Sequence, residues 1–199
     1  MKRLLDILLS LPLLIILLPI FAAIAIAVRL SSKGPCIFKQ ERAGRSGKPF
    51  VFYKFRTMKL NVDPFGPSPK SGDDPRLTGV GKFLREYSLD ELPQLLNVLK
   101  GDMSIVGPRP LYISQMAEWN ERQKKRLLVK PGLTGLAQTC GRGELTREEK
   151  LELDVKYVET ASFWLDAKIV LATIAQVFRR KHIYEKRYST TEYTRKEGR

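Results

Sequence analysis

The hydrophobic pattern of the chain begins with a long apolar segment. From Ile7 to Val28 nearly every residue is apolar, and only Ser10 interrupts the run with a polar side chain. About twenty such residues match the length of a helix that crosses a bilayer. The segment is apolar on every face, which a small domain could hardly cover, so we expect it to lie in a membrane.

The prolines and flanking charges of this segment favour a helix that enters and leaves the membrane on one side. Pro12 and Pro19 each remove a backbone donor, and Pro19 lies near the middle of the run. Basic residues draw both ends to the cytoplasm: Lys2, Arg3, Arg29 and Lys33. We therefore predict a re-entrant helix-hairpin over residues 1–33, broken at Pro19. A straight span, a cleavable signal peptide and a buried core helix are the alternatives.

Alternating positions predict a β-hairpin after the membrane segment. Two β-rich runs, Cys36 to Arg42 and Pro49 to Met58, are joined by a turn-forming Gly44-Arg-Ser-Gly47. The period of two places Lys54 and Arg56 on the same face of the second run. This pair is either part of a solvated, half-buried strand or an anion site.

Helical spacing returns at the centre of the chain. Ser88-Leu-Asp-Glu91 fits a capping box with Ser88 as N-cap, although Pro93 favours a start nearer Leu92. In either case Asp90 and Glu91 lie at a helix N-terminus, where the helix dipole keeps a carboxylate ionised. The leucines that follow at helical spacing predict a buried face: Leu92, Leu95, Leu96 and Leu99.

Three further helices and one long loop complete the pattern. A short helix is expected over Gly79 to Arg85, and a capping box at Thr146-Arg-Glu-Glu149 opens a helix to about Glu159. Phe163 to Lys181 is either an interfacial amphipathic helix or an ordinary core helix. The polar stretch from Asn61 to Pro75 reads as a loop.

Composition adds a strong positive charge to this picture. The 199 residues carry a net charge of +14, so we expect a polyanionic partner: nucleic acid, phosphorylated metabolites or an acidic bilayer. Cys36, Cys140 and His182 are isolated from one another, which suggests neither a zinc site nor a disulfide framework. Two free thiols fit a reducing cytosol.

Arginines in rigid or close-approach backbone are candidate phosphate ligands. Arg109 lies between Pro108 and Pro110 and is kept extended, so little entropy is lost when its fork binds a phosphate. Arg142 lies between two glycines. Neither the P-loop spacing nor a dinucleotide fingerprint occurs in the sequence.

Six motifs in order resemble those of the bacterial sugar transferases, the monotopic phosphoglycosyl transferases. They follow the basic, apolar N-terminus with its central proline and cover nearly the whole chain. They are Phe38-Lys-Gln-Glu-Arg42, Tyr53-Lys-Phe-Arg-Thr-Met58, Ser88-Leu-Asp-Glu-Leu-Pro-Gln-Leu, Asn97-Val-Leu-Lys-Gly-Asp-Met-Ser, Val106-Gly-Pro-Arg-Pro110 and Lys130-Pro-Gly-Leu-Thr-Gly-Leu-Ala-Gln138. Many relatives have a serine before the central proline, where this chain has Leu18.

The resemblance implies an α+β, mostly helical enzyme. It would transfer sugar 1-phosphate from a UDP-sugar to undecaprenyl (polyprenyl) phosphate and release UMP. Asp90 would be the nucleophile that carries a covalent phosphosugar, with Mg²⁺ nearby, and Glu91 would assist proton transfer or position the lipid phosphate. The cations at motif positions expected to meet phosphates or uridine are Lys54, Arg56, Arg85, Arg109 and Arg142.

The resemblance also implies how the chain is divided and located. Residues 1–33 would form the membrane-embedded helix, 34–182 a cytosolic catalytic domain with a β-hairpin and interfacial helices, and 183–199 a peripheral tail. The enzyme would lie among the lipids of the bacterial inner membrane with its catalytic domain on the cytoplasmic face, and without a nucleic-acid partner. A membrane-tethered basic binding module and an inactive scaffold are the competing hypotheses. The motifs leave the sugar open between glucose, galactose and N-acetylhexosamine types.

Overall fold

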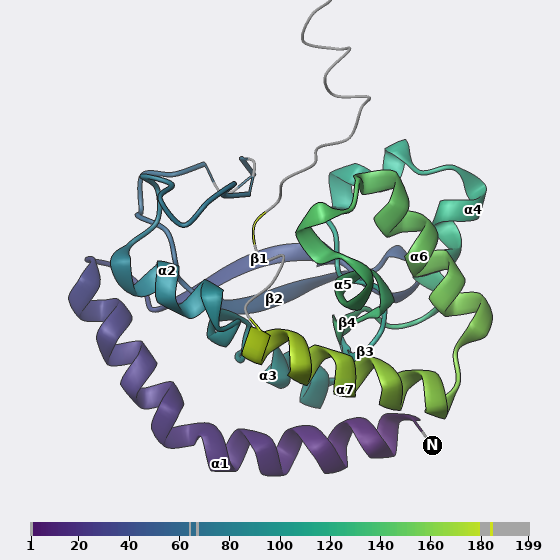
Figure 1. Ribbon diagram of the computed structural model, residues 1–199, viewed down its shortest axis with the longest axis horizontal. Helices are drawn as coiled ribbons and strands as arrows, with labels where there is room; N and C mark the ends of the chain where they lie inside the picture. The colour runs from purple at the N-terminus through teal and green to yellow at the C-terminus, as the bar shows by residue number, and fades with distance from the viewer. Residues whose placement is uncertain (1, 64, 67, 180–183, 185–199) are drawn as a thin grey trace, which may run out of the picture.

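The computed structural model describes residues 2–63, 65–66, 68–179 and 184 of the chain (Figure 1). The predicted peripheral tail, apart from Tyr184, lies outside the described residues. Helices predominate over two small sheets, which confirms the mostly helical α+β character.

The α-helices are α1 Lys2–Ser31, α2 Gly79–Glu86, α3 Gln94–Lys100, α4 Glu121–Lys124, α5 Leu136–Cys140, α6 Arg147–Thr160 and α7 Phe163–Arg179. The strands are β1 Ile37–Ala43, β2 Pro49–Phe55, β3 Ser104–Val106 and β4 Gly132–Thr134, and the 3₁₀ helices are η1 Arg45–Gly47, η2 Leu89–Glu91, η3 Ile113–Glu118, η4 Lys125–Leu128 and η5 Arg142–Glu144.

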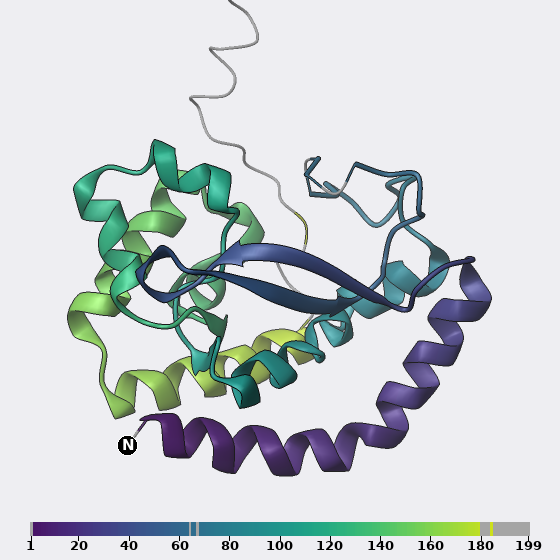
Figure 2. The same ribbon diagram turned by 180° about the vertical axis from the view of Figure 1, so that it is seen from behind.

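Helix α1 bends along one side of the folded domain and returns to it at both ends (Figures 1 and 2). Pro12 and Pro19 lie inside one continuous helix, so the predicted break is a bend rather than an interruption. The helix is long and apolar enough to cross a membrane by length and composition. Most of its apolar side chains are exposed, with Ile16 at 71%. An exposed apolar surface of this extent is typical of a segment that contacts lipid.

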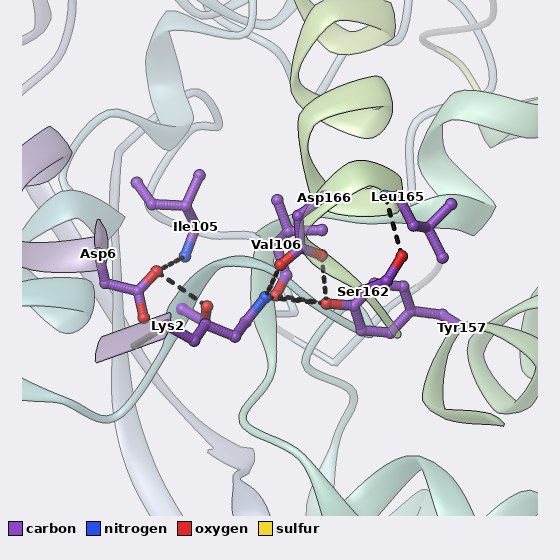
Figure 3. Close-up of polar contacts among 9 residues, drawn as sticks. Lys2, Asp6, Ile105, Val106, Tyr157, Ser162, Leu165 and Asp166 are labelled. Carbon is purple, nitrogen blue, oxygen red and sulfur yellow. Dashed lines mark hydrogen bonds and ion pairs between the residues drawn. The ribbon is translucent and has the colours of Figure 1, made fainter. Parts of the chain in front are cut away.

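Polar contacts fix the first turns of α1 to the domain (Figure 3). The carboxylate of Asp6 is buried, and its Oδ1 accepts hydrogen bonds from Ser104 Oγ and from the backbone N–H of Ile105, both at 2.9 Å. Lys2 forms an ion pair with Asp166 on α7 and donates to Tyr157 Oη at 2.9 Å. The start of α1 is therefore joined to β3, α6 and α7.

Arg3 connects α1 to the helix that carries the central leucines. Its Nη1 donates to the carbonyl of Val98, and its Nη2 donates to the carbonyl of Leu99 at 2.6 Å. These carbonyls belong to the last turn of α3, which Gly101 ends in a left-handed conformation at φ 93°. A cation at a helix C-terminus satisfies free carbonyls and opposes the helix dipole.

The β-hairpin packs against helices through some of its side chains and leaves others exposed. Strands β1 and β2 pair antiparallel, with Ile37 opposite Phe55 and Ala43 opposite Pro49. Phe52 packs against α3 and Met103, whereas Phe55 packs against α1 and α2. The predicted strand thus exists and is half-buried, since Phe52 and Phe55 are buried whereas Val51 is 40% exposed, but it ends at Phe55 instead of Met58.

A second sheet pairs two segments that the sequence pattern did not connect. Strands β3 and β4 are parallel, with Ser104 opposite Gly132 and Val106 opposite Thr134. A Cβ atom on Gly132 would lie 2.1 Å from the backbone nitrogen of Gly107, so only glycine permits this approach. The turn-rich segment from Lys130 to Gln138 therefore contains a strand and the helix α5.

Two local predictions at the centre of the chain are wrong. Ser88 has left-handed backbone angles, φ 56° and ψ 20°, and its side chain caps no helix. The capping box fails because this conformation directs Ser88 away from the following N–H groups. The predicted buried face is confirmed at Leu95, which is fully buried, but it is wrong at Leu96, which is 40% exposed while Val98 is fully buried. By contrast, Thr146 and Glu149 form the predicted capping box at the start of α6.

Candidate active site

The carboxylate pair lies on a helical turn between α2 and α3. Asp90 and Glu91 belong to η2, and Leu92 and Pro93 continue with right-handed helical angles into α3. The two acids therefore occupy the first turn of a helical path that runs to Lys100, as predicted. Because Arg3 of α1 binds the other end of this path, the apolar helix α1 contacts the same helical path that carries the carboxylates.

Asp90 is buried and unpaired. Asp90 is 6% exposed. Its carboxylate makes no hydrogen bond or ion pair with any residue that the structure describes. Burial and the neighbouring Glu91 raise the pKa of Asp90 to about 6, against the opposing effects of Arg85, Lys54 and Arg109. Above that pH the site holds an ionised carboxylate with free oxygens.

Glu91 is held in place by Arg109. Arg109 Nη2 lies 2.6 Å from Glu91 Oε1 and Arg109 Nη1 lies 3.2 Å from Glu91 Oε2, which is the bidentate geometry of a guanidinium on a carboxylate. Arg109 comes from the Pro108-Arg-Pro110 loop directly after β3. The predicted rigid arginine thus meets the predicted acid pair.

Other cations surround the carboxylates. Lys54 of β2 and Arg85 of α2, both predicted phosphate ligands, act on the charge of Asp90. Burial, together with the nearby Arg85, lowers the pKa of Lys54 to about 8, although Asp90 opposes this. Its ammonium lies 4.9 Å from the centre of the Phe38 ring. The side chain of Lys54 is thus fixed by packing and is available to an incoming anion.

Arg42 is a member of this cluster that sequence reasoning did not single out. It stacks on Tyr112, with its guanidinium carbon 3.7 Å from the ring centre, and donates to Gln40 at 2.7 Å. Burial lowers its pKa to about 10, and the nearby Arg109 contributes to the decrease. Positive groups outnumber the two carboxylates here, so the site is arranged to receive further negative charge. The feature of the sequence that could have identified Arg42 is its place at the end of the Phe38 to Arg42 motif.

Two predicted phosphate ligands have different placements. Arg56 follows the last residue of β2, and its Nη2 donates to the carbonyl and hydroxyl oxygens of Ser32 at 2.7 and 3.0 Å. The side chain of Arg56 therefore points to the end of α1. Although Lys54 and Arg56 were predicted to share one face of the strand, only Lys54 lies near the acids. Arg142 lies on η5, and its side chain is outside the described part of the structure.

A buried ion pair supports Arg109 from behind. Arg126 and Asp154 are 4% and 3% exposed, and Arg126 Nη2 lies 2.7 Å from Asp154 Oδ2. The same Nη2 donates to the backbone carbonyl of Arg109 at 2.5 Å, and the guanidinium stacks on Trp119. Sequence analysis missed this pair because two charges 28 positions apart look like ordinary surface residues.

The donor set suits a metal ion that relies on substrate oxygens. The described residues contain no group of three or more His, Cys, Asp or Glu side chains that could hold a metal by themselves. Mg²⁺, however, is commonly held by one or two carboxylates together with substrate phosphates. The unpaired oxygens of Asp90 fit that role, whereas those of Glu91 are occupied by Arg109.

The site thus combines a buried carboxylate with several cations, in a chain that also has a long, exposed apolar helix. The pattern of the bacterial sugar transferase family matches residues 1–180, and the chain belongs to this family. It is 45% identical over 192 residues to the uncharacterized sugar transferase EpsL of Bacillus subtilis (strain 168), covering 96% of this chain and 94% of that protein.

Longer relatives carry more specific names. The chain is 44% identical to the UDP-glucose:undecaprenyl-phosphate glucose-1-phosphate transferase of Escherichia coli (strain K12), over 92% of this chain and 41% of that protein. It is 39% identical to the undecaprenyl-phosphate galactose phosphotransferase of Salmonella typhimurium, over 92% of this chain and 42% of that protein. The chain therefore spans less than half the length of these two relatives.

Proposed function

We propose that this protein transfers sugar 1-phosphate from a UDP-sugar to undecaprenyl phosphate, with UMP as the second product. The observation that carries the proposal is the buried, unpaired carboxylate of Asp90, on which the charges of Lys54, Arg85 and Arg109 act, with Arg42 as a further cation near Lys54 and Glu91. Membership of the sugar transferase family and the printed names of the longer relatives support the choice of substrates.

Asp90 is the nucleophile in this proposal. One of its oxygens attacks the phosphorus next to the sugar, and the bond from that phosphorus to the bridging oxygen breaks, so UMP leaves with the bonding electrons. The aspartyl phosphosugar is then attacked by an oxygen of undecaprenyl phosphate, which frees the Asp90 carboxylate. Two successive displacements let one small site serve two bulky substrates in turn.

The cations make the approach of two anions to a carboxylate possible. Two unit charges 4 Å apart repel by about 4 kcal/mol at an effective dielectric constant near 20. Fixed guanidinium and ammonium groups offset this repulsion without having to reorganise during the reaction. Arg109 also keeps Glu91 in a fixed orientation, from which its carboxylate can position the incoming lipid phosphate.

We propose Asp90 as the protein ligand of the Mg²⁺ that the family resemblance implies. A bound Mg²⁺ would neutralise the charge of the diphosphate. Removal of divalent cations with a chelator should therefore abolish UMP release, and restored Mg²⁺ should recover it.

The proposed membrane arrangement is re-entrant, with the folded domain on the cytoplasmic face. Asp6 near the start of α1 contacts β3, while Ile24 and Val28 near its end pack with Phe55 and Leu84. These contacts of both helix ends with one domain support the proposal that both ends lie on the same side of the bilayer. The exposed Phe163 and Trp164 at the head of α7 fit a place at the interface.

The decisive experiment is UMP release by the full chain in detergent with undecaprenyl phosphate and a panel of UDP-sugars. The native protein should release UMP with one sugar preferred, and its intact mass should increase by one phosphosugar when the lipid is omitted. Asp90→Asn should abolish both signals, whereas Asp73→Asn, which changes an exposed carboxylate, should abolish neither. Normal adduct formation by Asp90→Asn would exclude Asp90 as the nucleophile.

The topology has its own test. A cysteine placed at position 2 should react with a membrane-impermeant thiol reagent only from the cytoplasmic side in inverted vesicles. Reaction from the periplasmic side would contradict re-entry.

A further inference from the structure

A cleft lies where the membrane helix ends, apart from the carboxylate pair. It has a volume of about 380 Å³. Its wall is formed by the residues that follow α1, the loop that follows β2 and the segment that precedes α2. The polar and charged side chains that line it are those of Ser32, Lys33, Lys59, Asn61 and Arg76.

The charge of this cleft is positive and only partly compensated. Lys33 and Lys59 form no side-chain ion pair with any residue that the structure describes. Arg76 is paired with Asp74, 2.7 Å from Nη2 to Oδ2, and its hydrogen bond lowers the pKa of Asp74 to about 2. One of the three cations is therefore neutralised, and the two lysines are left to meet an external anion.

A fourth cation lies behind the wall. Arg56 is 6% exposed and donates to both oxygens of Ser32 through Nη2. Its Nε and Nη1 are buried without a hydrogen-bond partner. A Cβ atom on Gly34 would lie 2.6 Å from Nη1 and 2.9 Å from the side chain of Leu60, so the guanidinium lies against the turn that borders the cleft. A buried guanidinium with unsatisfied donors strengthens the positive potential at Ser32.

An apolar groove borders the same turn. It is lined by Ala25, Ile26, Arg29, Leu30 and Cys36, and its volume is about 280 Å³. Arg29 Nη1 donates to the carbonyl of Gly34 at 3.1 Å, which links this groove to the turn at the edge of the cationic cleft. A phosphate recess beside an apolar groove matches the headgroup and chain of a lipid.

We propose that the cleft of Ser32, Lys33, Lys59 and Arg76 binds a phosphate group, carried by an anionic phospholipid whose acyl chain lies in the neighbouring groove. The lipid assignment rests on the proposed membrane function, because the cleft opens at the first polar residues after the apolar run. The site is separate from the carboxylate pair, and it holds the exit of α1 at the level of the headgroups. Each lysine near such a surface contributes about 1 kcal/mol of attraction to anionic lipid.

The test uses the full chain purified in a zwitterionic detergent and titrated with phosphatidylglycerol, with bound lipid counted by native mass spectrometry. The cleft variant is Lys33→Gln/Lys59→Gln. The control is Lys39→Gln/Lys48→Gln, which removes the same charge from two exposed positions at the hairpin. Native protein and control should retain one lipid at a concentration about thirtyfold lower than the cleft variant requires, because the variant lacks two lysines. Equal retention by all three proteins would overturn the proposal.

A second arm separates the lipid from free phosphate. Inorganic phosphate is titrated against the thermal midpoint of the same three proteins. A midpoint shift that only the cleft variant loses, without any difference in lipid retention, would overturn the lipid assignment and leave a site for soluble phosphate. UMP release in detergent is measured in parallel for the native protein. Absence of UMP release would count against the transferase, and normal release with equal lipid retention would count against the cleft alone.

Discussion

The guanidinium of Arg126 donates a hydrogen bond to the backbone carbonyl of Arg109, the residue whose own guanidinium holds Glu91. Arg126 is in turn held by the buried carboxylate of Asp154. A chain of contacts thus runs from α6 through η4 to the acid pair, although neither Arg126 nor Asp154 is itself placed to touch a substrate. We regard Arg126 as a positioning residue for Arg109.

The substitution Arg126→Lys tests this chain. A lysine retains the positive charge beside Asp154 but lacks the planar fork that reaches two acceptors at once. We expect a folded protein with kcat/KM for UMP release lowered about tenfold, corresponding to about 1.4 kcal/mol. The control is Arg122→Lys, because Arg122 pairs only with Glu152 and Glu159 at the surface, where ion pairs contribute little. If both variants lose activity equally, the contact with Arg109 is not the cause.

The two glycines of α2 have different surroundings, which gives a matched pair of substitutions. A Cβ atom on Gly81 would lie 1.9 Å from the carbonyl oxygen of Thr57, whereas one on Gly79 would meet nothing within 4 Å. Gly81→Ala must push α2 away from the backbone of Thr57 and carry Arg85 with it, at a cost of about 1–3 kcal/mol. Gly79→Ala should stabilise the helix by up to about 1 kcal/mol.

Thermal midpoints and UMP release of these two variants check the argument. We expect Gly81→Ala to lower both and Gly79→Ala to leave the activity unchanged. Tolerance of Gly81→Ala would show that the contact between α2 and Thr57 can relax without moving Arg85.

The features that could be predicted from the sequence are those formed by residues close together in the chain. The capping box of Thr146 and Glu149 depends on four consecutive residues, and the β-hairpin on a short turn, so patterns in the sequence were sufficient for both. The acid pair at the start of a helical path was predictable for the same reason. The exception is Ser88, where the left-handed backbone of one residue removed a cap that its identity favoured.

Features that join distant segments could not be read from the sequence. The parallel pairing of β3 with β4 and the burial of Arg126 with Asp154 depend on how α6 and the β4 segment pack beside Arg109. Arg56 was expected beside Lys54 from strand alternation, but β2 ends one residue earlier and Arg56 turns to Ser32. Periodicity gives the face of a residue only within the element that contains it.

Because Asp6 attaches α1 to β3, we expect substitutions of Asp6 to lower the stability of the fold by different amounts. Asp6→Leu removes the acceptor for Ser104 Oγ and for the N–H of Ile105 and leaves both donors without their partner. We expect a loss of about 1–3 kcal/mol for such buried groups. Asp6→Asn retains a carbonyl oxygen at the same position and should recover most of the loss.

Thermal unfolding in detergent measures this response, and limited proteolysis reports whether α1 separates from the domain. Asp6→Leu should be cleaved sooner near the N-terminus than Asp6→Asn. Equal midpoints for the two variants would show that the carbonyl oxygen is not the stabilising feature.

The raised pKa of Asp90 predicts that this carboxylate, the proposed nucleophile, destabilises the fold at neutral pH. Its pKa is about 6 in the folded protein, against an ordinary value of 3.8, so the folded state binds the proton more tightly than the unfolded state does. The stability that this protonation confers is fully present below pH 3.8 and is lost as the pH rises through 6. Each unit of pKa is worth about 1.4 kcal/mol. Asp90→Asn, which stays neutral, should therefore be more stable than the native protein by about 1–3 kcal/mol at pH 8, while losing UMP release.

The measurement is the thermal midpoint of both proteins between pH 4 and pH 8, with a chelator present so that no cation binds Asp90. The difference should be largest at pH 8 and shrink toward zero near pH 4. Asp73→Asn, at an exposed carboxylate, should show no such pH-dependent gain. A lower midpoint for Asp90→Asn at pH 8 would mean that the nearby cations stabilise the ionised carboxylate more than burial destabilises it. In that case the site would be fully formed only with Asp90 charged, and the same titration would then predict a loss of folded protein below pH 4.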